Sequence, residues 1–257
     1  AGAHLNVSNN KVSSSYGGGI YIDTLGSILK ITGIETMVTV TGNMAQQRGG
    51  GIFMQTACSV VVSDGAQVIV ADNAAGSFGG GLYAQDTGTH FNVTGAGTQV
   101  SFIGNRAASR GGGVVGANLA TMTVSAGAQM NVSKNGGSTQ IGGGFYMQTA
   151  KLYIAGTRTH VTVDQNTAVQ GGGGLYLGDS SEMTIASGAR LDSVHNEAAV
   201  DGGGMFTQVN SKVFITGVGT QARFCDNTAR ASGGGLYQSS NSIMQISSSA
   251  HVHFFHN

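Results

Sequence analysis

The chain has 257 residues, among them 44 glycines and no proline, and its 12 acidic residues balance its 12 basic ones. The balanced charge and the lack of an apolar run of about 18 residues exclude a basic nucleic-acid-binding surface and a membrane-spanning helix. Collagen needs proline and a glycine at every third position, and the hydrophobic content of 40% disfavours disorder. The glycines therefore predict a regular repeat.

Two marks define the repeat. A Gly-Gly-Gly triplet followed by an apolar residue starts at Gly17, Gly49, Gly79, Gly111, Gly142, Gly172, Gly202 and Gly233. An Asn precedes each triplet by six or seven residues and a ninth ends the chain: Asn10, Asn43, Asn73, Asn105, Asn135, Asn166, Asn196, Asn227 and Asn257. Because both marks recur every ~31 residues along the whole chain, we expect a repeat architecture.

A second period is superimposed on the first. Seven residues before each Asn, alanine and threonine alternate without exception: Ala3, Thr36, Ala66, Thr98, Ala128, Thr159, Ala189, Thr220 and Ala250. This alternation predicts a double repeat of ~62 residues that was itself duplicated.

Each repeat contains three short segments with the alternation typical of strands. In the first repeats these are a segment that follows the triplet and includes Ile20, residues 29–31, and residues 38–40 before the next Asn. Three strands per turn predict an all-β fold, a right-handed single-stranded parallel β-helix (β-solenoid) of about eight coils of ~31 residues, with equivalent positions about 4.8 Å apart. A β-propeller is the alternative, but its blades have four antiparallel strands in 40 or more residues.

The Asn and Gly columns have structural explanations. A turn Asn can adopt a left-handed backbone conformation, and stacked Asn amides can bond to one another as a ladder. The glycines permit a positive φ or a close approach between coils. A phosphate-binding loop needs a helix behind the glycines, and no helix is predicted after any triplet. We therefore expect no cofactor.

The repeat resembles that of a known family. Three copies read Phe-x-x-Asn and end at Asn105, Asn227 and Asn257, while the other six have Val or Ser in place of Phe. Phe-x-x-Asn followed by Gly-Gly-Ala is the repeat of chlamydial polymorphic outer-membrane proteins, although this chain has Gly-Gly-Gly throughout. The resemblance implies an exported β-helix of the autotransporter-passenger type, used in adhesion.

The most regular surface feature is predicted to be aromatic. One residue after the first apolar column stand Tyr21, Phe53, Tyr83, Tyr146, Tyr176, Phe206 and Tyr237, with Val115 in the fourth copy. Alternation along a strand predicts that this column points outward. An exposed aromatic ladder can bind a sugar chain or pack against another filament. Alternatively, the rings only stack on one another and stiffen the sheet.

Charged residues gather near the C-terminal end. Asp192, Arg223 and His253 share one outward column, and His195, Asp226 and His256 share the neighbouring turn column. Acids and bases on adjacent coils are the arrangement used by β-helical polysaccharide lyases and hydrolases. His253, His256 and Asp226 also suggest a metal site. We favour ordinary surface ion pairs, and thus neither catalysis nor a bound metal.

The chain has two cysteines and three glycosylation sequons. Cys58 and Cys225 lie five coils apart, about 24 Å, which is too far for a disulfide. Three glycosylation sequons begin at Asn6, Asn92 and Asn131, all at outward positions.

Residues 1–10 and 248–257 align with the same part of a coil, and neither end carries a polar cap. We therefore expect residues 1–257 to be a single β-solenoid segment that continues in a longer chain or joins other copies end to end or side by side. The first functional hypothesis is a secreted or cell-surface structural or adhesive fibre or stalk. The alternatives are an adhesin passenger that binds host or carbohydrate through the aromatic ladder, and a polysaccharide lyase or hydrolase.

Overall fold

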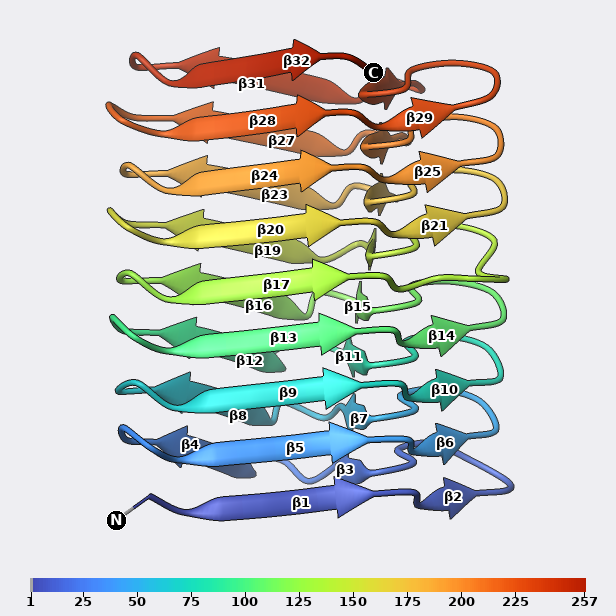
Figure 1. Ribbon diagram of the computed structural model, residues 1–257, viewed down its shortest axis with the longest axis vertical. Coiled ribbons are helices and arrows are strands. Elements are labelled where there is room, and N and C mark those ends of the chain that lie inside the picture. The colour runs from blue at the N-terminus through green and yellow to red at the C-terminus, as the bar shows by residue number, and fades with distance from the viewer. Residues whose placement is uncertain (1) are drawn as a thin grey trace.

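The computed structural model describes residues 2–257 and contains β-strands but no helix in that range. Strands from successive repeats lie above one another and pair in parallel, so the chain forms a stack of coils from the N-terminus to the C-terminus (Figure 1). The predicted all-β solenoid of about eight coils of ~31 residues is confirmed.

Three long sheets form the walls. Sheet 1 follows the glycine triplets and consists of β3 (Ile20–Ile22), β7 (Ile52–Met54), β11 (Leu82–Gln85), β15 (Val114–Ala117), β18 (Phe145–Gln148), β22 (Leu175–Gly178), β26 (Met205–Thr207) and β30 (Leu236–Gln238). Sheet 2 consists of β4 (Ile28–Thr32), β8 (Ser59–Ser63), β12 (His90–Thr94), β16 (Thr121–Ser125), β19 (Lys151–Ala155), β23 (Glu182–Ala186), β27 (Lys212–Thr216) and β31 (Ile243–Ser247). Sheet 3 precedes the Asn column and consists of β1 (His4–Ser8), β5 (Met37–Thr41), β9 (Gln67–Ala71), β13 (Gln99–Ile103), β17 (Gln129–Ser133), β20 (His160–Asp164), β24 (Arg190–Val194), β28 (Gln221–Cys225) and β32 (His251–Phe255).

A fourth strand of two residues follows the Asn in most coils, which the sequence did not reveal. These strands form two small sheets: β2 (Lys11–Val12), β6 (Met44–Ala45), β10 (Ala74–Ala75) and β14 (Arg106–Ala107), then β21 (Thr167–Ala168), β25 (Glu197–Ala198) and β29 (Thr228–Ala229). The interruption falls after Asn135, where Gly136 and Gly137 have φ of +117° and +73°. Two residues are too few to produce a readable alternation, which explains the omission.

The main core lies between the three long sheets. In β20, for example, Val161 and Val163 are 0% exposed, whereas Thr162 between them faces outward. Equivalent positions repeat this pattern in successive coils, so the buried side chains form one continuous apolar column.

Each glycine of a triplet meets a different requirement, as the second coil illustrates. Gly49 has φ of +64°, a conformation that side chains with a Cβ rarely adopt. A Cβ on Gly50 would lie 2.6 Å from the carbonyl oxygen of Gly80 in the next coil. A Cβ on Gly51 would lie 3.0 Å from the side-chain nitrogen of Asn73. The triplet and the Asn column therefore form one packing unit.

The asparagines lie in a hydrogen-bonded column at the end of sheet 3. Nδ2 of Asn105 donates to Oδ1 of Asn135 (3.0 Å) and to the backbone oxygen of Val70 (2.9 Å). Its Oδ1 accepts from both Nδ2 and the backbone N–H of Asn73, each at 3.0 Å. Seven members, Asn43 through Asn227, are at most 1% exposed. Each buried amide therefore uses both its donor and its acceptor groups.

The expectation that the asparagines themselves are left-handed is wrong. The residue before each Asn has the positive φ, between +51° and +66°: Asn9, Gly42, Asp72, Gly104, Lys134, Gln165, His195, Asp226 and His256. None of the nine ladder asparagines has a positive φ. The backbone therefore turns at the residue before each Asn, and the Asn side chain points into the column rather than into solvent.

Two kinds of turn alternate between sheet 2 and sheet 3 and explain the double repeat. Asp64 and Gly65 both have positive φ, as in a type I′ turn, whereas Gly97 has a positive φ at the third turn residue, as in type II. The buried Thr98 hydroxyl accepts a hydrogen bond from the N–H of Gly65 in the preceding coil (3.0 Å). The same bond joins Gly127 to Thr159 and Gly188 to Thr220. Each of these threonine coils is thus bonded to the alanine coil before it.

Replacing a central ladder residue should destabilise the solenoid strongly. Asn105→Ala leaves two N–H groups of Asn73 without their acceptor and the backbone oxygen of Val70 without its side-chain donor, and each unsatisfied group costs about 1–3 kcal/mol. We predict a loss of about 3 kcal/mol or more in the free energy of unfolding, measured by chemical denaturation followed by circular dichroism. The control is Asn92→Ala, on the outer face of β12. Equal losses in the two variants would contradict the ladder's role.

Candidate functional site

The aromatic column is buried, which corrects the prediction of an exposed ladder. Phe53, Tyr83, Tyr146 and Tyr176 are at most 6% exposed. Phe206 and Tyr237 are half-buried, and Tyr21, in the first coil, is 49% exposed. The rings point away from the main core, as the alternation predicted, but they form a second apolar cluster.

The second cluster exists because the chain before each triplet folds over the outer face of sheet 1. The residues immediately before successive triplets pair through single parallel bridges: Arg48, Phe78, Arg110, Ile141, Gly171, Asp201 and Ser232. Phe78 and Ile141 pack against the rings. Most of the outward face of sheet 1 is therefore covered, and its rings do not form a continuous exposed ladder.

The rings stack in two runs. Centroids of Tyr21, Phe53 and Tyr83 follow one another at 5.2 and 5.6 Å. From Tyr146 to Tyr237, successive centroids are 5.3, 4.9 and 4.8 Å apart. Val115 separates the two runs. Burial raises the pKa of Tyr176 to about 12, so its phenol is neutral at ordinary pH.

The charged cluster around Asp192 differs from the predicted column. Asp192, Arg223 and His253 do share one register position. However, Asp192 Oδ2 lies 2.9 Å from His160 Nε2 and accepts a hydrogen bond from Arg190 Nε at 2.8 Å. Arg223 Nε is 4.0 Å from Oδ1. The close partners come from diagonal and same-strand positions rather than from the column.

Asp192 is held in its ionised form. Burial alone would raise the pKa of its carboxyl, but the hydrogen bonds from His160 and Arg190 outweigh burial and bring the pKa below its ordinary value. A general acid needs a carboxyl that keeps its proton near neutral pH. The arrangement is therefore an ion-paired surface cluster, poorly suited to donate a proton.

A chain of alternating acids and histidines runs along the neighbouring turns. His195 lies 3.0 Å from Asp164 and 3.8 Å from Asp226, and His256 lies 3.6 Å from Asp226. Within residues 2–257, no group of three or more His, Cys, Asp or Glu side chains is placed to hold a metal ion. The alternative metal site of His253, His256 and Asp226 is therefore not formed.

The remaining predicted residues have simple environments. Cys58 and Cys225 are buried free thiols. Asn6 is exposed, whereas Asn92 and Asn131 are half-buried on outer strand faces. No helix in the described part of the chain is long and apolar enough to cross a membrane.

Comparison with known proteins adds little. No protein-family model and no curated protein matches the chain. Among solved structures, the chain is similar to a TibC-catalysed hyper-glycosylated TibA fragment, at 16% identity, over 96% of this chain and 99% of that one, with a TM-score of 0.16. A TM-score this low carries no argument about fold or function.

The cluster at Asp192 should make stability depend on acid pH. A carboxyl whose pKa is lower in the folded state stabilises the fold above its unfolded pKa, and this contribution disappears as pH falls through the folded value. We predict that the wild type loses stability below the ordinary aspartate pKa of 3.8. In Asp192→Asn this component of the loss should be missing. Urea denaturation over a pH series measures it, and identical pH profiles for the two proteins would contradict the assignment.

Proposed function

We propose that the chain is a rigid structural or adhesive segment of a secreted or cell-surface protein and that it has no catalytic activity. The observation that carries the proposal is the buried Asn ladder. The ladder runs through every coil. The most regular positions of the sequence therefore hold each coil in register with the next. Eight steps of about 4.8 Å give a rod roughly 40 Å long.

A rod of this kind resists bending for a physical reason. Each coil is bonded to the next through the long sheets, the Asn amides and the stacked rings together. Bending would have to break several of these columns at once, because they lie on different sides of the coil. Such a body suits a spacer or stalk that holds other parts of a protein at a fixed distance.

The surface location rests on the repeat itself. Phe-x-x-Asn followed by glycines resembles the β-helical passengers of chlamydial polymorphic outer-membrane proteins. Here only three copies carry the Phe, and the glycine triplet replaces Gly-Gly-Ala. We extend the autotransporter-passenger role to this chain as part of the same proposal.

The competing functions find less support. The polysaccharide lyase or hydrolase would depend on Asp192, but its carboxylate is ion-paired with Arg190 and hydrogen-bonded to His160, and its pKa is lowered. An adhesin that contacts its target through the aromatic ladder would need exposed rings, and those of Phe53 and Tyr83 are covered.

The proposal is tested by antibody labelling of cells that make the protein. Antibodies raised against the folded chain should label intact, unpermeabilised cells. A variant that lacks residues 98–158, one double repeat, should be labelled equally, because the deletion joins Gly97 to Thr159 at the equivalent turn and leaves the coils in register.

An antibody against a cytoplasmic protein is the control and should label cells only after permeabilisation. Labelling of the chain only after permeabilisation would contradict the surface role. Loss of folding in the deletion variant would contradict the interchangeability of the coils.

A further inference from the structure

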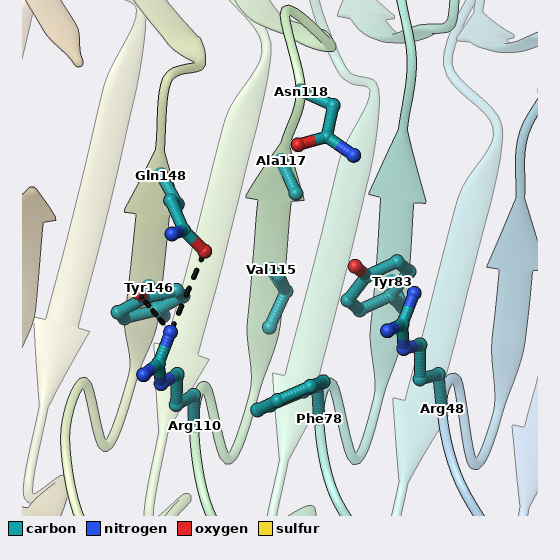
Figure 2. A pocket seen from close by; sticks show the side chains of 9 residues that line it. All are labelled: Arg48, Phe78, Tyr83, Arg110, Val115, Ala117, Asn118, Tyr146 and Gln148. Atoms are coloured by element: carbon teal, nitrogen blue, oxygen red, sulfur yellow. Dashed lines mark hydrogen bonds between the residues drawn. The ribbon is translucent and has the colours of Figure 1, made fainter. Parts of the chain in front are cut away.

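The aromatic column has one vacancy, and the vacancy is a pocket. Figure 2 places Val115 between Tyr83 and Tyr146, at the ladder position that holds a ring in the other seven coils. The space beside it measures ≈ 150 Å³. A cavity of this volume is large enough for one benzene-sized ring.

The flanking rings suit a stacked occupant. Successive rings elsewhere in the column are 4.8–5.6 Å apart, whereas Tyr83 and Tyr146 are two coil steps apart, about 9.6 Å. A ring in the slot would therefore lie between them at the normal spacing of the column, beside Phe78, which lines the pocket and stacks on Tyr83 at a centroid distance of 6.3 Å. Both tyrosines are at most 5% exposed, so the occupant would be largely sheltered from water.

Two arginines give the slot a positive charge. The guanidinium carbon of Arg48 lies 5.2 Å from the Tyr83 centroid, and that of Arg110 lies 5.2 Å from the Tyr146 centroid. Nη1 of Arg110 donates to the Tyr146 hydroxyl at 2.8 Å. Among the residues that the structure describes, Asp192 provides the only carboxylate within 4.0 Å of an arginine side chain. Arg48 Nη1 donates to Gln85 Oε1 at 3.1 Å and Arg110 Nη1 to Gln148 Oε1 at 3.5 Å, both neutral acceptors. The charge of each guanidinium is therefore not paired, and its other N–H groups can bind an anion.

We propose that this ring slot, lined by Arg48, Tyr83, Arg110, Val115 and Tyr146, binds a six-membered ring that carries a carboxylate. The ring stacks between the tyrosines and the carboxylate pairs with a guanidinium. An aromatic carboxylate and a uronic acid unit of a glycan share this chemistry. This proposal does not depend on the proposed rod function. Ligand binding is tested on the isolated chain in solution, whereas the rod function is tested on cells.

The second coil shows how a phenylalanine fits at the position that Val115 occupies in the fourth coil. There Arg48 precedes the triplet and Phe53 holds the ladder position, just as Arg110 and Val115 do in the fourth coil. Arg48 and the fully buried Phe53 fit together in the same local backbone. Val115→Phe should therefore fill the slot with the protein's own ring and complete the column without disturbing the fold.

The test is titration of the whole chain with benzoate and with glucuronate, using benzyl alcohol and glucose as neutral counterparts, followed by calorimetry and ligand-observed NMR. We expect at least one acid to bind with a dissociation constant of about 1 mM or tighter. Its neutral counterpart should bind at least about ten-fold more weakly, since a charged hydrogen bond is lost. Binding of benzoate alone identifies an aromatic ligand, and binding of glucuronate alone identifies an acidic glycan.

The variants separate the slot from any other site. Val115→Phe should abolish binding while the melting temperature stays equal or rises, whereas Val115→Ala should keep it. Arg110→Gln should weaken binding at least about ten-fold. If Val115→Phe does not fold, this variant alone tests whether the ligand binds in the slot. The inference is overturned if neither acid binds, if the neutral rings bind equally well, or if Val115→Phe or Arg110→Gln binds like the wild type.

Discussion

A column of buried side-chain amides holds each coil in register with the next. An amide inside the protein is costly unless both its N–H groups and its oxygen find partners, and here the partners are the same residue one coil above and below. A shift of one residue would leave the whole column unsatisfied. The third glycine of each triplet follows from this constraint, because a Cβ on Gly51 would crowd the Asn73 amide. The left-handed residue before each Asn turns the chain at the same place.

Much of the fold was predictable because a solenoid repeats its constraints. The spacing of Asn and Gly-Gly-Gly predicted the coil, and the Ala/Thr alternation predicted the double repeat. The physical basis of that alternation is a hydrogen bond from the Gly65 N–H to the Thr98 hydroxyl of the next coil. The spacing of residues in the sequence does not show such a contact between coils. The two-residue strands after the Asn were missed because they are shorter than one period of alternation.

The candidate sites were less predictable because they depend on segments that lie across the sheet. Alternation placed the aromatic column on the outer face of sheet 1 correctly. It did not reveal that the loop before each triplet covers this face, although apolar residues at Phe78 and Ile141 were the available signal. For Asp192, comparison within one column overlooked His160 and Arg190, which reach it diagonally and along the strand. The pocket at Val115 arises only because the surrounding rings are enclosed.

The most direct test of the ladder is native-state hydrogen exchange of the asparagine side-chain amides, followed by NMR. The account predicts that the Nδ2 protons of the seven buried members, from Asn43 to Asn227, exchange as slowly as the backbone amides of sheet 3. The side chains of Asn6, Asn92 and Asn131, on outer faces, should exchange rapidly in the same sample. Fast exchange of the seven ladder amides while the backbone of sheet 3 stays protected would contradict the central role of the ladder.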